Sequence, residues 1–191
     1  MKGDGMKESI LVHPISHSNP VYIRERSGYG MKGKLVQLNI SPGGMPKLPI
    51  KKAFVSFDRV EGDAHRHHDH GGRQRAVCLF SVELIADLKK EGYTLYPGAM
   101  GENFTTEGLD YHAIRLGDVF QVGNEVQIKI NRIRIPCASL DMYGKGIPEK
   151  IYDAEVKQGN VETFKWGRSG YKCEVLKEGT VRPGDKIVKI G

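Results

Sequence analysis

Cysteine and long apolar segments are both scarce in this chain, and each scarcity excludes a class of protein. Only 3 of the 191 residues are cysteine, and their positions show no paired spacing. This count argues against a disulfide-stapled scaffold and favours a reducing compartment. The chain shows neither an apolar leader segment nor an apolar run long enough to span a bilayer. We therefore expect a cytoplasmic protein with no membrane partner.

Clustered charge is missing as well. The formal net charge is +6, but the Lys and Arg residues are scattered and are not interleaved with aromatic residues. This pattern predicts a solvated basic surface rather than a nucleic-acid interface, so we expect no nucleic-acid partner. The cationic excess could still attract a phosphorylated cofactor.

Glycine and short β-prone segments are abundant instead. The chain contains 24 glycines, and short runs of β-branched residues between them favour strands and turns. The predicted strands span residues 34–40, 53–57, 76–80, 118–122, 126–130, 133–135, 172–177 and 186–190. Two short helices are predicted, over residues 82–88 after an N-cap at Ser81 and over 147–157 before Gly159.

These elements predict a mainly β fold, a closed or nearly closed barrel with one or two short α-helices. The length suits one domain. Residues 1–30 lack a sustained period, and we interpret them as a flexible arm or an extension from an upstream start codon. The folded domain is then expected to span residues 31–191.

A histidine-rich segment is the most conspicuous local motif. His65, His67, Asp69 and His70 match the pattern H-x-H-x-D-H of zinc hydrolases, whose imidazole and carboxylate groups bind zinc and activate water. The residues ahead of the motif are charged and loop-like rather than a buried strand, and only His112 follows to complete a ligand set. A solvated loop or an adventitious metal site is therefore the preferred interpretation.

Four other segments agree with one another. They are EGD at 61–63 followed by HGGRQRAV at 70–77, GENFTTEGL at 101–109, LGDVFQVG at 116–123, and RIPC at 134–137. In this order and spacing they resemble the MOSC family, which is named for the C-terminal domain of molybdenum cofactor sulfurases. The resemblance extends from about residue 34 to the last residue.

The resemblance implies a β-barrel in which Cys137 is the reactive residue. In members that bind the molybdenum cofactor, this thiolate is a ligand of the metal, and a soft thiolate suits a molybdenum ion already bound by dithiolene sulfurs. In sulfur-transfer members it is thought to carry a persulfide. No pyridoxal phosphate is expected in this chain, because that activity belongs to a separate region of the sulfurases.

The candidate cofactor contacts are cationic side chains, flexible glycines and two further polar residues. They are Arg134, Arg75, Arg132, Asn103, His70, Gly71 and Gly72. Arginine can grip the cofactor phosphate through two hydrogen bonds, and glycines let backbone amides approach an anion. Arg134 could also lower the thiol pKa, although an odd separation from Cys137 requires the chain to bend near Pro136.

Several of these residues have a purely structural alternative. Asn103 could fix a turn, and His70 could support a neighbouring group. Cys78 and Cys173 lie in apolar strands and are interpreted as small buried hydrophobic residues. Trp166, the single tryptophan, is interpreted as a packing residue.

Two functions remain open at this point. The first is an oxidoreductase that uses the molybdenum cofactor to reduce N-hydroxylated compounds, with electrons from a reductase partner, because the chain has no flavin, nicotinamide or iron–sulfur signature. The second is a non-redox module that carries persulfide sulfur or the cofactor to another enzyme and receives the sulfur from a donor protein.

Overall fold

A computed structural model describes residues 30–64 and 71–191. The predicted arm, apart from Gly30, and the segment 65–70 lie outside the described residues. The strands are β1 Lys32–Ile40, β2 Leu48–Ile50, β3 Ala53–Val55, β4 Val77–Ser81, β5 Phe104–Glu107, β6 Val119–Val122, β7 Val126–Ile133, β8 Tyr171–Lys177, β9 Gly179–Val181 and β10 Lys186–Lys189. The α-helices are α1 Val82–Lys90, α2 Ile147–Ile151 and α3 Ala154–Lys157, and the 3-10 helices are η2 Arg73–Arg75 and η3 Ala138–Tyr143.

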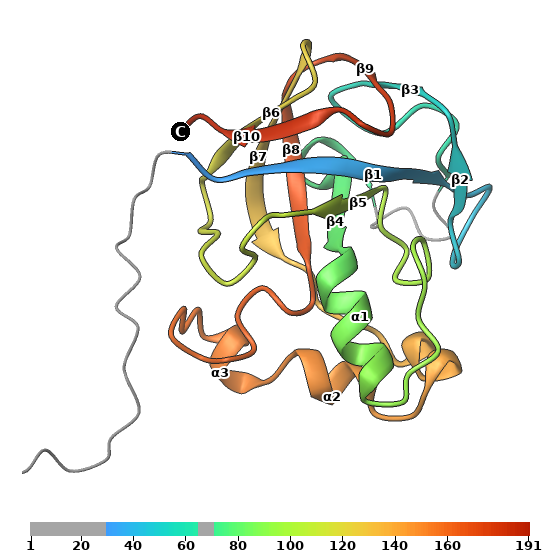
Figure 1. The fold of residues 1–191 in the computed structure, drawn as a ribbon, viewed down its shortest axis with the longest axis vertical. Coiled ribbons are helices and arrows are strands. Elements are labelled where there is room, and N and C mark those ends of the chain that lie inside the picture. Colours follow the sequence, from blue (N-terminus) through green and yellow to red (C-terminus); the bar gives the residue numbers. More distant parts are fainter. Residues whose placement is uncertain (1–29, 65–70) are drawn as a thin grey trace, which may run out of the picture.

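Seven strands close into a barrel in the order β1, β10, β6, β7, β8, β4, β5 and back to β1 (Figure 1). All pairs in this ring are antiparallel except β4 with β5. That pair is parallel because α1 and the following loop form the crossover between its strands. The mainly β barrel with few short helices is therefore confirmed.

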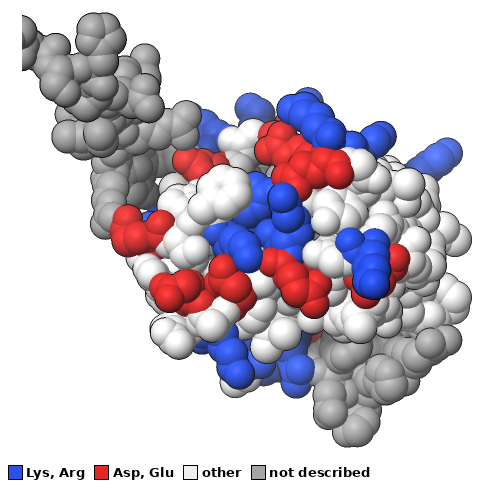
Figure 2. All heavy atoms as spheres, turned by 90° about the horizontal axis from the view of Figure 1, so that it is seen from below, with Lys and Arg blue, Asp and Glu red and all other residues white. Residues whose placement is uncertain are grey.

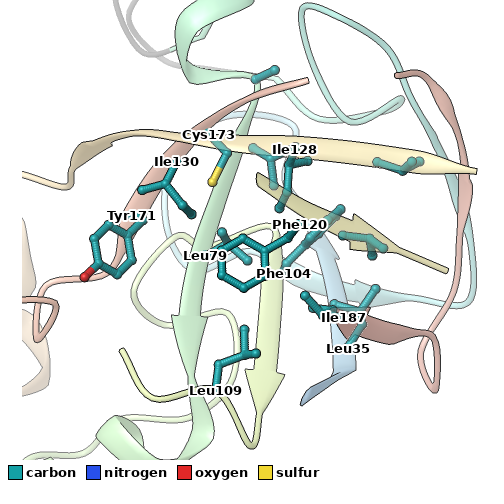
Figure 3. Close-up of a cluster of buried hydrophobic side chains, with 14 of the residues drawn as sticks. Leu35, Leu79, Phe104, Leu109, Phe120, Ile128, Ile130, Tyr171, Cys173 and Ile187 are labelled. Atoms are coloured by element: carbon teal, nitrogen blue, oxygen red, sulfur yellow. The ribbon is translucent and has the colours of Figure 1, made fainter. Parts of the chain in front are cut away.

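Alternating apolar side chains fill the barrel. On β7 the inward residues are Val126, Ile128 and Ile130, and each is almost completely buried. They meet side chains from the facing strands, including Phe104 and Phe120, as the close-up in Figure 3 shows. Burial of this kind contributes roughly 25 cal/mol per Å² of apolar surface.

A second apolar cluster lies between the barrel and the helices. Helix α1 begins after Ser81, whose hydroxyl accepts a hydrogen bond from the backbone N–H of Leu84, as the predicted N-cap requires. Its buried residues Ile85 and Leu88 pack with Leu140 of η3 and with α2. This packing holds the segment that follows β7 against the outside of the barrel (Figure 1).

Two predicted elements were wrong in detail. The strand predicted at 133–135 is the end of β7, and Ile135 lies beyond it, where Pro136 offers no N–H for a further strand pair. The helix predicted at 147–157 is two helices, α2 and α3. The chain is extended at Tyr152 (φ −150°, ψ 146°), and Asp153 begins a new helix by accepting a hydrogen bond from the Val156 N–H.

Candidate functional site

Cys137 stands where the chain leaves the barrel. The Arg134 N–H still donates to the Gly170 carbonyl at 3.0 Å, but the chain then departs from the sheet. Cys137 is extended (φ −113°, ψ 159°) and directly precedes η3, whose Leu140 N–H donates to the Cys137 carbonyl. The Cys137 side chain is exposed. The fold therefore presents a thiol to solvent at the end of β7, on a segment anchored by its neighbours.

The other two cysteines are buried, as predicted. Cys78 lies on β4, and Cys173 lies on β8 within the barrel core. Burial raises the pKa of the Cys173 thiol well above its ordinary value, with a smaller contribution from Cys78. A buried thiol that stays protonated is a poor nucleophile and a poor metal ligand. Cys137 is consequently the one thiol placed for chemistry.

Arg134, unlike Cys137, points into the protein. It is only 7% exposed, its Nη2 atom lies 3.8 Å from the sulfur of Met45, and its Nη1 atom has no hydrogen-bond partner. Because an unpaired buried donor costs about 1–3 kcal/mol, this atom is a candidate contact for a ligand. The sequence predicted Arg134 as a cofactor contact, and it stays a prediction.

Two more buried polar atoms near Arg134 lack a hydrogen-bond partner. They are Oε2 of Glu102 and the hydroxyl of Tyr143. The other carboxylate oxygen of Glu102 accepts hydrogen bonds from the Gly98 N–H at 2.6 Å and the Thr105 hydroxyl at 2.8 Å. Burial raises the pKa of Glu102, while these two bonds and the charge of Arg134 oppose the rise. Burial also raises the pKa of Tyr143, and its neighbours Tyr96 and Glu102 add to this effect. We call Glu102, Arg134 and Tyr143 the open cluster.

Arg132 lies on the other side of the chain from Arg134. It is exposed, and its Nη2 donates to the Gln74 side chain of η2 at 3.2 Å. Asn131 donates to the Gln74 carbonyl at 2.9 Å, so η2 is fixed against the end of β7. Arg75 is half-buried in the same turn. The fold thus brings Arg132 together with η2, the turn that carries Arg75.

The predicted glycine turn precedes η2. Gly72 has φ +82°, a left-handed conformation that favours glycine, and its carbonyl accepts the Arg75 N–H at 2.8 Å. Gly71 is half-buried and Gly72 exposed. His70, the remaining candidate of this turn, lies outside the described residues together with the rest of the histidine motif.

Asn103 is held by bonds within the protein. Its Oδ1 accepts the Cys78 N–H at 3.1 Å, and its Nδ2 donates to Asp63 at 2.9 Å and to the Asn39 carbonyl at 3.3 Å. Asp63 in turn forms a buried ion pair with Lys47. Burial lowers the pKa of Lys47, and the charge of Asp63 opposes this. We call Lys47, Asp63 and Asn103 the closed cluster, because every one of their side chains has a protein partner.

Sequence reasoning missed most of both clusters. Glu102 was not among the predicted contacts, although it lies in the GENFTTEGL motif, which was the available signal. Tyr143 and Lys47 carry no local signal, because their importance comes from burial and from distant partners. Trp166 is buried, and its indole N–H donates to the Ile114 carbonyl at 2.8 Å, in keeping with its predicted packing role.

The described part of the chain offers neither a metal cluster nor a membrane-spanning helix. Within residues 30–64 and 71–191, no three His, Cys, Asp or Glu side chains are grouped to hold a metal ion. In the same two stretches, no helix has the length and apolar character needed to cross a membrane. Because residues 65–70 lie outside the described residues, the finding on metal ligands does not test the zinc site considered there.

The barrel and the exposed motif cysteine define a MOSC domain, and the chain belongs to that family: the family profile matches residues 66–188. The relatives it resembles include a protein named reductase from Gibberella moniliformis, 31% identical over 70% of this chain and 23% of that protein. Uncharacterized protein YflK of Bacillus subtilis is 30% identical over 75% of this chain and 62% of its own. The chain thus spans less than two thirds of each of these relatives.

Solved structures share the fold. The crystal structure of YiiM from Geobacillus stearothermophilus superposes with a TM-score of 0.62 at 24% identity, covering 83% of this chain and 75% of that one. The YUAD protein of Bacillus subtilis gives a TM-score of 0.63 at 18% identity, covering 83% and 95%. At these identities the likeness shows the fold alone.

Proposed function

We propose that this protein binds the molybdenum cofactor, with the Cys137 thiolate as a metal ligand, and reduces N-hydroxylated compounds. The observation that carries the proposal is the exposed thiol just after β7, three residues along the chain from a buried arginine whose Nη1 has no partner. A thiolate is a ligand that molybdenum accepts, and a guanidinium is a strong partner for a phosphate. The relative named reductase is consistent with a redox role.

The donor set fits the cofactor. Cys137 would hold the metal, and Arg134, whose Nη1 atom has no partner, would hold the phosphate. Arg75 and Arg132 stay proposed contacts that the geometry does not bring to Arg134. An anion could approach the backbone at Gly72, because no atom of the described residues lies within 4 Å of the place where a side chain would begin there. The bound cofactor would supply two-electron redox chemistry.

The residues of the protein have a defined task in that reaction. Reduction of R–NHOH to R–NH₂ breaks the N–O bond and consumes two electrons and two protons, with water as the second product. Cys137 would hold the metal at the protein surface, where its exposed side chain leaves access for a substrate. Residues 1–191 contain no flavin, nicotinamide or iron–sulfur signature, so the electrons would enter from outside these residues, and a reductase partner is the proposed source.

A second candidate function is favoured by the same exposure of Cys137. A thiolate open to solvent can attack the outer sulfur of a donor protein's persulfide. The S–S bond of the donor then breaks, the donor thiolate leaves, and Cys137 holds the transferred sulfur. In this version the protein delivers sulfur or cofactor to another enzyme and performs no reduction.

Metal and sulfur analysis separates the two. The protein is produced in a host that makes molybdenum cofactor, beside Cys137→Ser and, as a control for loss of an ordinary thiol, Cys78→Ala. Near-stoichiometric molybdenum in the parent and in Cys78→Ala, lost in Cys137→Ser, supports the oxidoreductase. Cyanide-labile sulfur in place of molybdenum supports the carrier. Zinc that survives the Cys137 change would revive the histidine motif.

A further inference from the structure

A cavity of about 280 Å³ lies between the first turn of α1 and the segments that precede β6 and β8. Residues 81, 83 and 84, 109–112, 164 and 166–168 line it. None of them is a candidate contact of the cofactor. Pockets that hold drug-sized ligands measure about 300–1,000 Å³, so this cavity suits a smaller molecule.

The cavity wall contains a buried arginine with two unpaired donors. Arg168 is 7% exposed, and among the described residues its Nε and Nη2 atoms have no hydrogen-bond partner. The Glu91 Oε1 atom lies 3.6 Å from Nη2, while Oε2 of Glu91 lies 2.6 Å from the Lys150 Nζ atom. Nε and Nη2 form one edge of the guanidinium, and this edge binds two oxygens of an oxyanion side by side. Because an unpaired buried donor is costly, an oxyanion is the partner that the edge lacks.

The remaining wall is largely apolar and aromatic. The polar atoms of its two buried rings are already used, since Tyr111 bonds the Thr106 hydroxyl and the Trp166 N–H donates to the Ile114 carbonyl. These rings therefore offer their faces and edges to a ligand, which suits an aromatic body.

Phe164 covers the arginine from outside. The Arg168 Cζ atom lies 4.7 Å from the centre of the Phe164 ring, and Phe164 is 73% exposed. Because so little of this ring is packed against the protein, it can swing aside to admit a ligand to the guanidinium.

Two carboxylates in the wall limit the charge of the ligand. Glu83 accepts the Gly108 N–H at 2.7 Å, and Asp110 accepts the His112 N–H at 3.2 Å. A phosphate group carries about 1.5–2 negative charges at neutral pH, and these carboxylates repel it more strongly than they repel a single charge. The wall therefore favours a carboxylate with one charge.

The surface near the helices adds no strong positive field. Lys150 pairs with Glu91, and Lys165 pairs with Asp153. Figure 2, which views the molecule from the end where the helices lie, shows Lys and Arg side chains set among Asp and Glu. A multiply charged anion therefore gains little from its surroundings, in agreement with the preference inside the cavity.

We propose that this cavity binds a small aromatic monocarboxylate. The carboxylate pairs with Nε and Nη2 of Arg168, and the ring packs against the apolar wall. This site is independent of the proposed function, but the backbone connects the two regions. Gly170, two residues after Arg168, accepts the Arg134 N–H at 3.0 Å, so the ligand is held by the segment that anchors Arg134.

The single tryptophan provides the readout, because Trp166 lines the cavity. Its fluorescence is followed while benzoate is added to the full chain, and benzamide, a neutral molecule of the same shape, is titrated in parallel. We expect benzoate to saturate the signal with a dissociation constant of about 1 mM or tighter. Benzamide should bind at least about tenfold more weakly, because it cannot form the charged pair.

Two further results of these titrations would overturn the proposal. One is equal affinity for benzoate and benzamide, and the other is no saturation by benzoate up to about 20 mM. Inorganic phosphate is the third probe, and we expect it to bind more weakly than benzoate. Tighter binding of phosphate would contradict the preference for a monocarboxylate.

A pair of arginine variants locates the binding. Arg168→Met removes the guanidinium from the cavity, and the control Arg182→Met removes the same charge from an exposed position between β9 and β10. Titration calorimetry with benzoate should show an affinity loss of at least about tenfold in Arg168→Met and parent affinity in Arg182→Met. Equal affinities of the two variants overturn the proposal. If Arg168→Met does not fold, the comparison of benzoate with benzamide in the parent decides alone.

Discussion

The closed and open clusters are both buried, polar and close to the barrel wall, yet their hydrogen bonding differs. In the closed cluster, the Asp63 carboxylate bonds the Ser41 N–H, Asn103 and Lys47. In the open cluster, Glu102, Arg134 and Tyr143 each retain an unpaired polar atom. Most buried polar groups in folded proteins have partners, and each exception calls for an explanation.

The difference indicates separate roles for the two clusters. The closed cluster ties the β1–β2 turn to β5 and leaves no atom for a ligand, so it serves the fold. The open cluster includes Arg134, three residues before Cys137. The unpaired donors and acceptor of this cluster are free to bind a polar ligand. A residue's place in a family motif does not distinguish these roles, since Asn103 and Glu102 are adjacent in GENFTTEGL.

The largest expected effect is on the closed cluster. Asp63→Ala removes the partner of a buried ammonium group, and we expect it to lower the free energy of unfolding by about 3–5 kcal/mol. Lys34 and Glu107 form an exposed pair, so Lys34→Ala, the matched control, should cost less than about 1 kcal/mol. Urea denaturation at neutral pH measures both. Similar losses in the two variants would contradict a structural role for the closed cluster.

Sequence reasoning succeeded where a local pattern determines the structure. Ser81 caps α1 because its hydroxyl reaches an N–H only three residues away. It predicted no strand at β5. Thr105 and Thr106 of this strand are buried because their hydroxyls bond with Glu102 and Tyr111, and Thr105 also accepts a hydrogen bond from Asn39 of β1, which no local pattern reveals.

The sequence predicted the reactive residue of the candidate site but not the burial of the arginines near it. Cys137 was found because Pro-Cys ends a family motif, and the barrel places it at the surface. The opposite burial of Arg132 and Arg134 was not predictable, since β7 ends at Ile133 and Arg134, just beyond it, is covered by Met45 from a distant loop. No local pattern records such a long-range contact.

An intermediate effect is expected for the pH dependence of stability through Glu102. Its pKa in the folded state is raised above the ordinary value of 4.5 by burial. The folded state therefore holds this proton more tightly, and the resulting stability is complete below pH 4.5 and is lost as the pH rises toward the folded-state pKa. Glu102→Gln keeps the shape without the charge, so the variant should gain stability relative to the parent as the pH rises. Thermal unfolding from pH 4 to 8 measures the difference, and a constant difference would contradict the prediction.

The smallest expected effect separates a paired from an unpaired hydroxyl. No hydrogen bond of good geometry reaches the Tyr143 hydroxyl, although Tyr96 lies close to it, so Tyr143→Phe should change the free energy of unfolding by less than about 0.5 kcal/mol. Tyr171, which is fully buried, donates to the Tyr111 carbonyl at 2.7 Å, and Tyr171→Phe leaves that carbonyl short of a donor at a cost of about 1–3 kcal/mol. Urea denaturation of the two variants side by side measures the contrast. If Tyr143→Phe cost as much as Tyr171→Phe, the Tyr143 hydroxyl would already be satisfied within the protein, and the open cluster would have one atom fewer to offer a ligand.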